Sequence, residues 1–320
     1  MESEKTVVGL RDLLPEQWFA GDRPHVIRMR AYQMARLTRE ALPEKFPWFA
    51  TTSAMILLNY GALQYVAAPN LEFVVVGPDD MQYRFNKDGL HRKTTELAHI
   101  VVIAPEGSSE DETRFRLDVA AGLVGSTLGR NAVFHLLFEN VVDLTSGQFS
   151  VASPTLWNPL ASEIPEVTPE GLDVLARGLH AIADLEEHVR NRVRLALNWH
   201  EQAMRSPAPD QFLKQWIALE ALGMDRRDNL RPLNGALAQA YGISVPEARD
   251  RFGLGRIFGF RSRIVHRGDR LSTHGLLHAY LEAIFRDVLY QKLTLPHRGF
   301  ASGVAESSAF NLPAFLYEGS

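Results

Sequence analysis

The spacing of hydrophobic positions changes along the chain and divides it into two parts. Between residues 71 and 105, short β-branched or aromatic runs alternate with the turn sequences GPDD, NKDG and PEG. This alternation predicts strands at LEFVVVG, MQYRFN and HIVVIAP. From residue 168 to residue 295, apolar residues instead recur every three or four positions, as in amphipathic helices. The pattern therefore predicts an α+β protein, with a mixed α/β N-terminal domain followed by an all-α bundle.

Other segments of the N-terminal part have a less regular pattern. Helical spacing predicts helices over residues 23–42 and 52–63 and favours one over residues 114–129, whereas residues 132–144 fit either a helix or a strand. Residues 144–168 hold several Pro, Ser and Thr residues and are typical of a linker. We therefore expect an N-terminal domain at residues 1–160, a helical domain at 168–295 and a C-terminal tail at 296–320.

Capping residues predict about five helices in the second domain. Thr168 precedes Pro169, a favourable N-cap and first-turn pair, and Ser244 with Glu247 forms a capping box. Asp210 is the expected cap of the helix QFLKQWIALEALG, and the run GLGRIFGFRSRIVHRG is expected to be helical up to His266. For the last long helix, GLLHAYLEAIFRDVLYQKL, the expected cap is Ser272 or Thr273.

Composition excludes several classes of protein. The 320 residues contain no cysteine, which excludes disulfides, thiolate nucleophiles and cysteine-bound zinc and suits a reducing cytoplasm. The eleven histidines show no paired ligand spacing, so we expect neither a metal site nor a cofactor. The most apolar window, AMILLNYGALQYVAA, is too short to span a bilayer, so no membrane association is expected. The net charge is −4, yet residues 249–270 hold seven arginines and two acids, the most favourable field for an anionic ligand.

Two charged residues lie on or beside apolar helix faces. Glu220 follows Trp216 by four positions, and Arg261 lies three positions before Ile264. A buried charge without a partner costs several kcal/mol, so each needs one. One interpretation is a structural Glu220–Arg261 ion pair that joins two helices, and another is a polar cleft at the same place; the two are compatible.

His266 adds a third polar group to this region. A helix advances about 100° per residue, so Arg261 and His266 lie about 140° apart and cannot be side by side on one straight helix. The long arginine side chain could bend round the helix, the helix could end between the two residues, or a second copy of the chain could bring an arginine close to a histidine. The simpler interpretation is a histidine that caps the last carbonyls of its helix.

The setting of these residues resembles a known family. The run VRLALNWHEQAMRSPAPDQFLKQWIALEALG, followed by FRSRIVHRGD, resembles the HEPN superfamily and within it the Apea-like branch, over roughly residues 170–295. The family motif is an arginine, a polar residue, a short spacer and a histidine, which Arg261, Ser262 and His266 match. The polar position is often Asn, Asp or His in the family, and here it is Ser.

The resemblance implies a helical bundle that dimerises with its motif helices facing each other. Many members of the family are metal-independent endoribonucleases in phage-defence or toxin–antitoxin systems, while others bind RNA, a nucleotide or a protein without catalysis. A histidine can move a proton at neutral pH, and an arginine can stabilise phosphate charge, so the residue types fit RNA cleavage by the 2′-hydroxyl.

We therefore expect a homodimeric endoribonuclease, a phage-defence or toxin effector, whose substrate is RNA. The catalytic residues are expected to be Arg261 and His266, with Ser262 and Glu220 in support. Three further arginines are expected to bind RNA: Arg256, Arg263 and Arg267. The alternatives are a non-catalytic module that binds RNA, a nucleotide or a protein, and a structural dimer in which Arg261 and Glu220 form an ion pair. The N-terminal domain, of unknown role, is expected to bind an unknown ligand or partner protein as a sensor or regulator.

Overall fold

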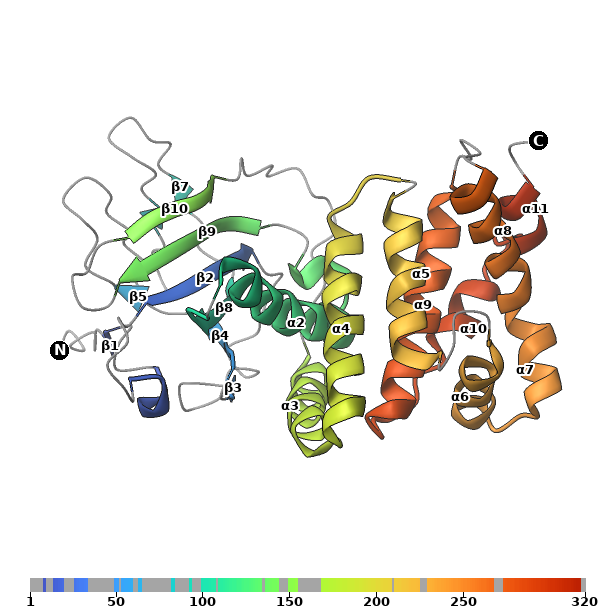
Figure 1. Ribbon diagram of the computed structural model, residues 1–320, viewed down its shortest axis with the longest axis horizontal. Helices are drawn as coiled ribbons and strands as arrows, with labels where there is room; N and C mark the ends of the chain where they lie inside the picture. The colour runs from blue at the N-terminus through green and yellow to red at the C-terminus, as the bar shows by residue number, and fades with distance from the viewer. Residues whose placement is uncertain are drawn as a thin grey trace. The chain divides into compact units, whose positions relative to one another are not determined.

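The structure is a computed structural model of the whole chain. It describes residues 8–9, 14–19, 26–33, 49–51, 53–59, 63–64, 82–83, 92–93, 99–107, 109–133, 136–143, 149–154, 168–208, 210–224, 229–267 and 273–317. The chain divides into two units, Met1–Asp173 and Val174–Ser320 (Figure 1). The first contains the strands and the second contains helices, so the protein belongs to the α+β class.

A six-stranded sheet forms the frame of the N-terminal unit. Its strand order is β10-β9-β2-β8-β4-β3, and every neighbouring pair is antiparallel. The strands are β2 (Val26–Gln33), β3 (Phe49–Ala50), β4 (Met55–Asn59), β8 (His99–Pro105), β9 (Leu136–Asp143) and β10 (Phe149–Pro154). The unit also contains β1 (Val8–Gly9) paired with β5 (Leu63–Gln64), β6 (Gln82–Tyr83) paired with β7 (Arg92–Lys93), and the short helices η1 (Glu16–Phe19) and η3 (Arg130–Val133).

One long helix, α2 (Glu110–Leu128), packs against β2 and β8. Ser109 caps it by accepting a hydrogen bond from the Glu112 amide at 3.1 Å, and the three acids of the first turn suit the positive end of the helix dipole. The helix ends at Gly129, whose φ of 100° favours glycine. The helix expected over residues 114–129 is therefore confirmed, and its start lies one turn earlier.

Two other predicted helices are wrong. Residues 26–33, within the predicted helix 23–42, form strand β2, and residues 55–59, within the predicted helix 52–63, form β4. In β2 the apolar residues Ile27, Met29 and Ala31 alternate with Arg28 and Arg30, and all five side chains are buried. The period-two alternation of a strand is therefore present in the sequence, although both faces of this strand are buried.

The remaining predictions for this unit have mixed outcomes. HIVVIAP forms β8 as predicted, and MQYRFN contains β6, whereas LEFVVVG lies outside the described residues. The ambiguous segment 132–144 contains strand β9 after a short 3-10 turn. The predicted linker 144–168 is wrong in part, because residues 149–154 form β10 and pair with β9.

Seven helices, α3 to α9, occupy the described residues between 168 and 295, where about five were predicted. Their bounds are α3 (Pro169–Asp184), α4 (Glu187–Met204), α5 (Asp210–Gly223), α6 (Arg231–Tyr241), α7 (Val245–Phe252), α8 (Leu254–Arg267) and α9 (Gly275–Lys292). The helix α5 packs on α4 and α9, and α6 packs on α7 and α9. The core between them is aromatic, with Phe212, Trp216, Phe252, Tyr280 and Phe285 among its fully buried side chains.

Two of the helix caps predicted from the sequence are present in the structure, and two are not. The Gly171 amide donates to Thr168 Oγ1 at 3.1 Å, and the Glu247 amide donates to Ser244 Oγ at 3.3 Å, as predicted. Asp210 is itself the first residue of α5, and α9 is capped by His274 rather than by Ser272 or Thr273. In that cap, His274 Nδ1 accepts a hydrogen bond from the Leu276 amide at 3.1 Å.

The segment expected as a tail belongs to the helical unit. It contains α10 (Phe300–Ala305) and α11 (Leu312–Tyr317), and α10 packs on α9 while α11 packs on α8. Four of its apolar residues are buried, Ala301, Leu312, Phe315 and Leu316, which explains why the segment folds onto the bundle.

Candidate functional site

The first half of the candidate site comes from α5. Phe212, Trp216 and Leu219 recur at helical spacing and are fully buried, as the sequence predicts. Glu220 follows Leu219 at the edge of this buried face, and its side chain remains 22% exposed. The carboxylate is held in place because Trp216 Nε1 donates a hydrogen bond to Glu220 Oε1 at 2.7 Å.

The second half comes from α8, which begins after Gly253 and continues through His266. Leu254, Ile257 and Phe260 form its buried face, whereas Val265 is 47% exposed. Phe260 meets Phe212 edge-on at 5.2 Å between ring centroids, so α8 lies against α5 at this level. A second ring contact, Phe258 with Trp216 at 6.0 Å, extends the same junction.

Arg261 and Glu220 meet across this junction. Arg261 Nη2 lies 3.8 Å from Glu220 Oε1, which agrees with the ion pair expected from helical spacing. The Arg261 side chain is 23% exposed, so the pair lies at the margin of the core rather than inside it. Solvent screens such a pair, and its contribution to stability is at most about 1 kcal/mol. The guanidinium is thus held by an acid on one side and open to solvent on the other.

The structure describes the other motif residues in less detail. Ser262 is partly exposed beside Arg261. His266 lies in the last turn of α8, and its side chain is outside the described part. Its position relative to Arg261 therefore follows from helix geometry. Because α8 is helical from residue 261 to residue 266, the separation of about 140° around the helix axis applies.

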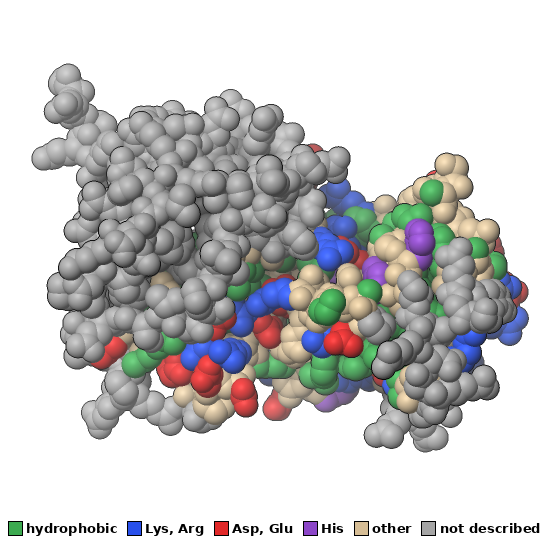
Figure 2. Space-filling model, turned by 90° about the horizontal axis from the view of Figure 1, so that it is seen from above, with side chains coloured by type: hydrophobic (Ala, Val, Ile, Leu, Met, Phe, Trp, Pro, Cys, Tyr) green, Lys and Arg blue, Asp and Glu red, His purple; other side chains and the backbone are tan. Residues whose placement is uncertain are grey.

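The three arginines expected to bind RNA have different environments. Arg256 is exposed. The guanidinium of Arg263 lies 5.3 Å from the Phe260 ring centroid and donates a hydrogen bond to the Leu316 carbonyl of α11. The side chain of Arg267 is outside the described part. In Figure 2 acidic and basic side chains lie interspersed over the described part of the visible face.

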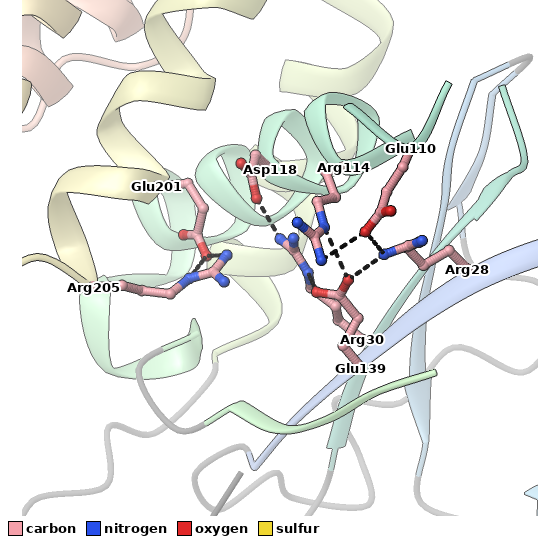
Figure 3. A network of polar contacts seen from close by, with 8 residues as sticks. All are labelled: Arg28, Arg30, Glu110, Arg114, Asp118, Glu139, Glu201 and Arg205. Carbon is pink, nitrogen blue, oxygen red and sulfur yellow. Dashed lines mark hydrogen bonds and ion pairs between the residues drawn. The ribbon is translucent and has the colours of Figure 1, made fainter. Parts of the chain in front are cut away.

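A second group of charges, absent from the sequence predictions, lies in the N-terminal unit (Figure 3). Arg28 and Arg30 of β2 are 5% and 3% exposed, and both hydrogen-bond to Glu139 of β9, at 2.9 and 2.6 Å. Arg30 also pairs with Asp118 of α2, and Arg28 pairs with Glu110 at 3.2 Å. Burial opposes ionisation of Glu139, but the two guanidinium groups more than compensate and hold its pKa below the ordinary value. The sequence signal is an arginine at every second position of a strand, which the helix prediction for residues 23–42 concealed.

The helix α4 carries a buried histidine and a buried glutamate next to each other. His200 and Glu201 are both fully buried. His200 stacks on Phe285 at 4.3 Å between ring centroids, and Glu201 accepts a hydrogen bond from Arg205 at 2.9 Å (Figure 3). Among the described side chains, no three or more His, Asp or Glu are grouped so as to hold a metal ion. Within the same part of the chain, no helix has both the length and the apolar character to cross a membrane.

Comparison of the chain with protein-family models, curated proteins and solved structures gives no match.

Proposed function

We propose that the helical unit is a HEPN-type endoribonuclease, in which Arg261 and His266 cleave RNA without a metal ion. The observation that carries the proposal is the state of Arg261. Its guanidinium lies 3.8 Å from the Glu220 carboxylate, which accepts a hydrogen bond from Trp216, while part of the side chain remains open to solvent. An arginine placed in this way is suited to a phosphate, because it is always protonated and partly accessible.

The proposed reaction uses the nucleophile that RNA itself carries. The 2′-oxygen attacks the adjacent phosphorus while a base accepts its proton, and the bond from phosphorus to the 5′-oxygen breaks as that oxygen takes up a proton. His266 is the residue of the motif that can exchange protons near neutral pH. Arg261 stabilises the extra negative charge on the phosphate oxygens during attack. The products are a 2′,3′-cyclic phosphate and a 5′-hydroxyl.

Glu220 has a positioning role in this scheme. A free carboxylate close to a phosphate would repel it, but the Trp216 hydrogen bond and the Arg261 contact both satisfy Glu220 Oε1. The acid thus holds the guanidinium at the α5–α8 junction. Ser262, one position further along α8, is partly exposed and can donate a hydrogen bond to a phosphate oxygen.

A second copy of the chain completes the proposed site. Gly255, Gly259 and Ser262 lie at positions i, i+4 and i+7 of α8 and therefore share one face. Both glycines are exposed, and a Cβ on either would meet nothing within 4 Å. Small residues allow two helices to approach closely, and Val265 adds an exposed apolar side chain three positions after Ser262. A twofold axis across this face would bring the two copies of α8, and with them the two motifs, side by side.

The test of this proposal is incubation of the purified chain with single-stranded RNA in excess EDTA. We expect cleavage to persist and the fragments to carry 2′,3′-cyclic phosphate and 5′-hydroxyl ends. Fragments with 5′-phosphate ends, or activity that requires added metal, would contradict the mechanism. Binding of RNA without cleavage would instead favour the non-catalytic module, and expression toxicity in cells would support a role as a defence or toxin effector.

A further inference from the structure

The C-terminal helix α11 is attached to the bundle differently from α10, which precedes it. The Phe300 and Ala301 amides, at the start of α10, donate to Asp287 Oδ1 and Oδ2 at 3.0 and 2.8 Å. Asp287 is fully buried in α9, and Tyr241 also donates to it at 2.6 Å. This buried carboxylate fixes α10 to the helical core.

The helix α11, in contrast, is held by side-chain packing at the surface. It has six residues, too few for a helix that is stable by itself, and it follows an exposed segment at residues 305–309. Leu312, Phe315 and Leu316 bury one face of it, at 8%, 6% and 3% exposure. Because α11 is short and follows an exposed segment, it can leave this surface while α10 and the core stay folded.

The docked position of α11 is directly beside the arginine–histidine motif. Phe315 stacks on His274, the cap of α9, at 4.3 Å between ring centroids. The Leu316 carbonyl, in the last turn of α11, accepts a hydrogen bond from Arg263 Nη2. Carbonyls of a last helical turn lack partners within their own helix, so Arg263 caps α11.

We infer that α11 is a detachable strap that competes with an RNA phosphate for Arg263, so that docking of the strap weakens RNA binding. The inference rests on the proposed RNA-binding role of this face. A phosphate forms a stronger, charge-assisted hydrogen bond with a guanidinium than a carbonyl does. RNA therefore favours the undocked strap, and by thermodynamic reciprocity the docked strap disfavours RNA.

The first test measures RNA affinity in the full chain. The double variant Phe315→Ala/Leu316→Ala removes the packing that docks α11, and Ser308→Ala, in the exposed segment, is the matched control. The probe is a 2′-O-methyl oligoribonucleotide, which binds as RNA does but lacks the nucleophile. We expect the double variant to bind about tenfold more tightly than the wild type, within the usual range of coupling between sites. We expect Ser308→Ala to bind like the wild type.

The same titration in an Arg263→Ala background shows whether the competition passes through this guanidinium. We expect the gain from undocking to disappear there, as in a double-mutant cycle for two coupled groups. Equal or weaker binding by the undocked variant, or a gain that survives without Arg263, would overturn the inference.

A second test needs no RNA. Hydrogen exchange should be much faster for the hydrogen-bonded amides of α11 than for those of α10, and addition of the oligonucleotide should speed exchange in α11 further. Equal protection of the two helices would overturn detachment of the strap. If neither form of the protein binds the oligonucleotide, the proposed function and the competition both fail, while the exchange rates still decide whether α11 detaches.

Discussion

At the scale of single residues, the two charge clusters differ in burial and therefore in what they contribute. Arg261 and Glu220 are each more than a fifth exposed, which suits a guanidinium that must reach a ligand. Arg30 and Glu139 are almost completely buried and satisfy each other, which suits a structural role. Loss of one partner from a buried pair leaves the other charge without compensation, at a cost of about 3–5 kcal/mol.

Glu139→Gln should therefore destabilise the sheet and change its response to acid. The pKa of Glu139 is lower in the folded state than its ordinary value of 4.5, so its stabilising contribution is complete above pH 4.5 and is lost as the pH falls through the folded-state pKa. We expect amide exchange in β2 and β9 to accelerate in the variant at neutral pH. We also expect the variant to lose less stability than the wild type on acidification.

Glu110→Gln provides the control, because Glu110 pairs with the same Arg28 but is 54% exposed. We expect Glu110→Gln to change the free energy of unfolding by no more than about 1 kcal/mol. If the wild type and Glu139→Gln lost the same amount of stability on acidification, the arginines would not be lowering the pKa of Glu139.

The two clusters also show which contacts can be predicted from sequence. The Glu220–Arg261 contact can be expected from the sequence, because helical spacing places each residue beside the apolar face of its helix. A charge in such a position needs a partner of opposite charge. The Arg28–Glu139 contact joins residues 111 positions apart in two different strands. Pairing of that kind depends on the strand order of the sheet, and no local pattern in the sequence contains this order.

At the scale of elements, the junction between α7 and α8 sets where the motif helix begins. Gly253 ends α7 with a φ of 63°, in the left-handed region, and α8 starts at the next residue. A Cβ at Gly253 would lie 2.8 Å from Leu312 Cδ2 of α11. The position thus needs glycine for its backbone conformation, and a methyl group there would also require the Leu312 side chain to shift.

Gly253→Ala should destabilise the helical unit by about 1 kcal/mol or more, because alanine is strained at this φ. Gly235→Ala is the matched control: it lies within α6, and its Cβ would meet nothing within 4 Å. We expect that change to stabilise by roughly 0.5–1 kcal/mol, the difference in helix propensity. Urea unfolding followed by far-ultraviolet circular dichroism measures both, and equal midpoints for the two variants would contradict the account of the junction.

Elements with regular amphipathic period were predicted better than those buried on both faces. The helices α5, α7 and α8 agree with the expectation because each has one buried apolar face. The strands β2 and β4 were mistaken for helices because β2 carries buried arginines and β4 is almost entirely apolar. Their strand character comes from neighbours in the sheet, which override local propensity.

At the scale of the whole molecule, the sequence predicts two domains, and the structure divides into two units between Asp173 and Val174. The C-terminal segment was misjudged as a tail because its helices are short and follow Pro- and Ser-containing stretches. Assembly remains a proposal, carried by the small-residue face of α8.

The proposed dimer should be sensitive to bulk on that face. We expect Gly259→Leu to shift the protein from dimer to monomer, because the added side chain would separate the two helices. Gly303→Leu, on α10, is the matched control, since a Cβ there also meets nothing within 4 Å. Light scattering at micromolar concentration measures the mass. A wild type that is monomeric with and without RNA would contradict the composite site.

The central claim is that Arg261 and His266 cleave RNA, and the cleavage rate of His266→Ala tests it most directly. The control is His188→Ala, a histidine of α4 whose side chain is 73% exposed. A general acid or base contributes about 10²–10⁴-fold, so we expect a loss of at least 100-fold for His266→Ala and none for His188→Ala. The melting temperature should fall by no more than a few degrees, because a histidine in a last helical turn typically contributes about 0.3–1 kcal/mol. Cleavage by folded His266→Ala at the wild-type rate would contradict the account.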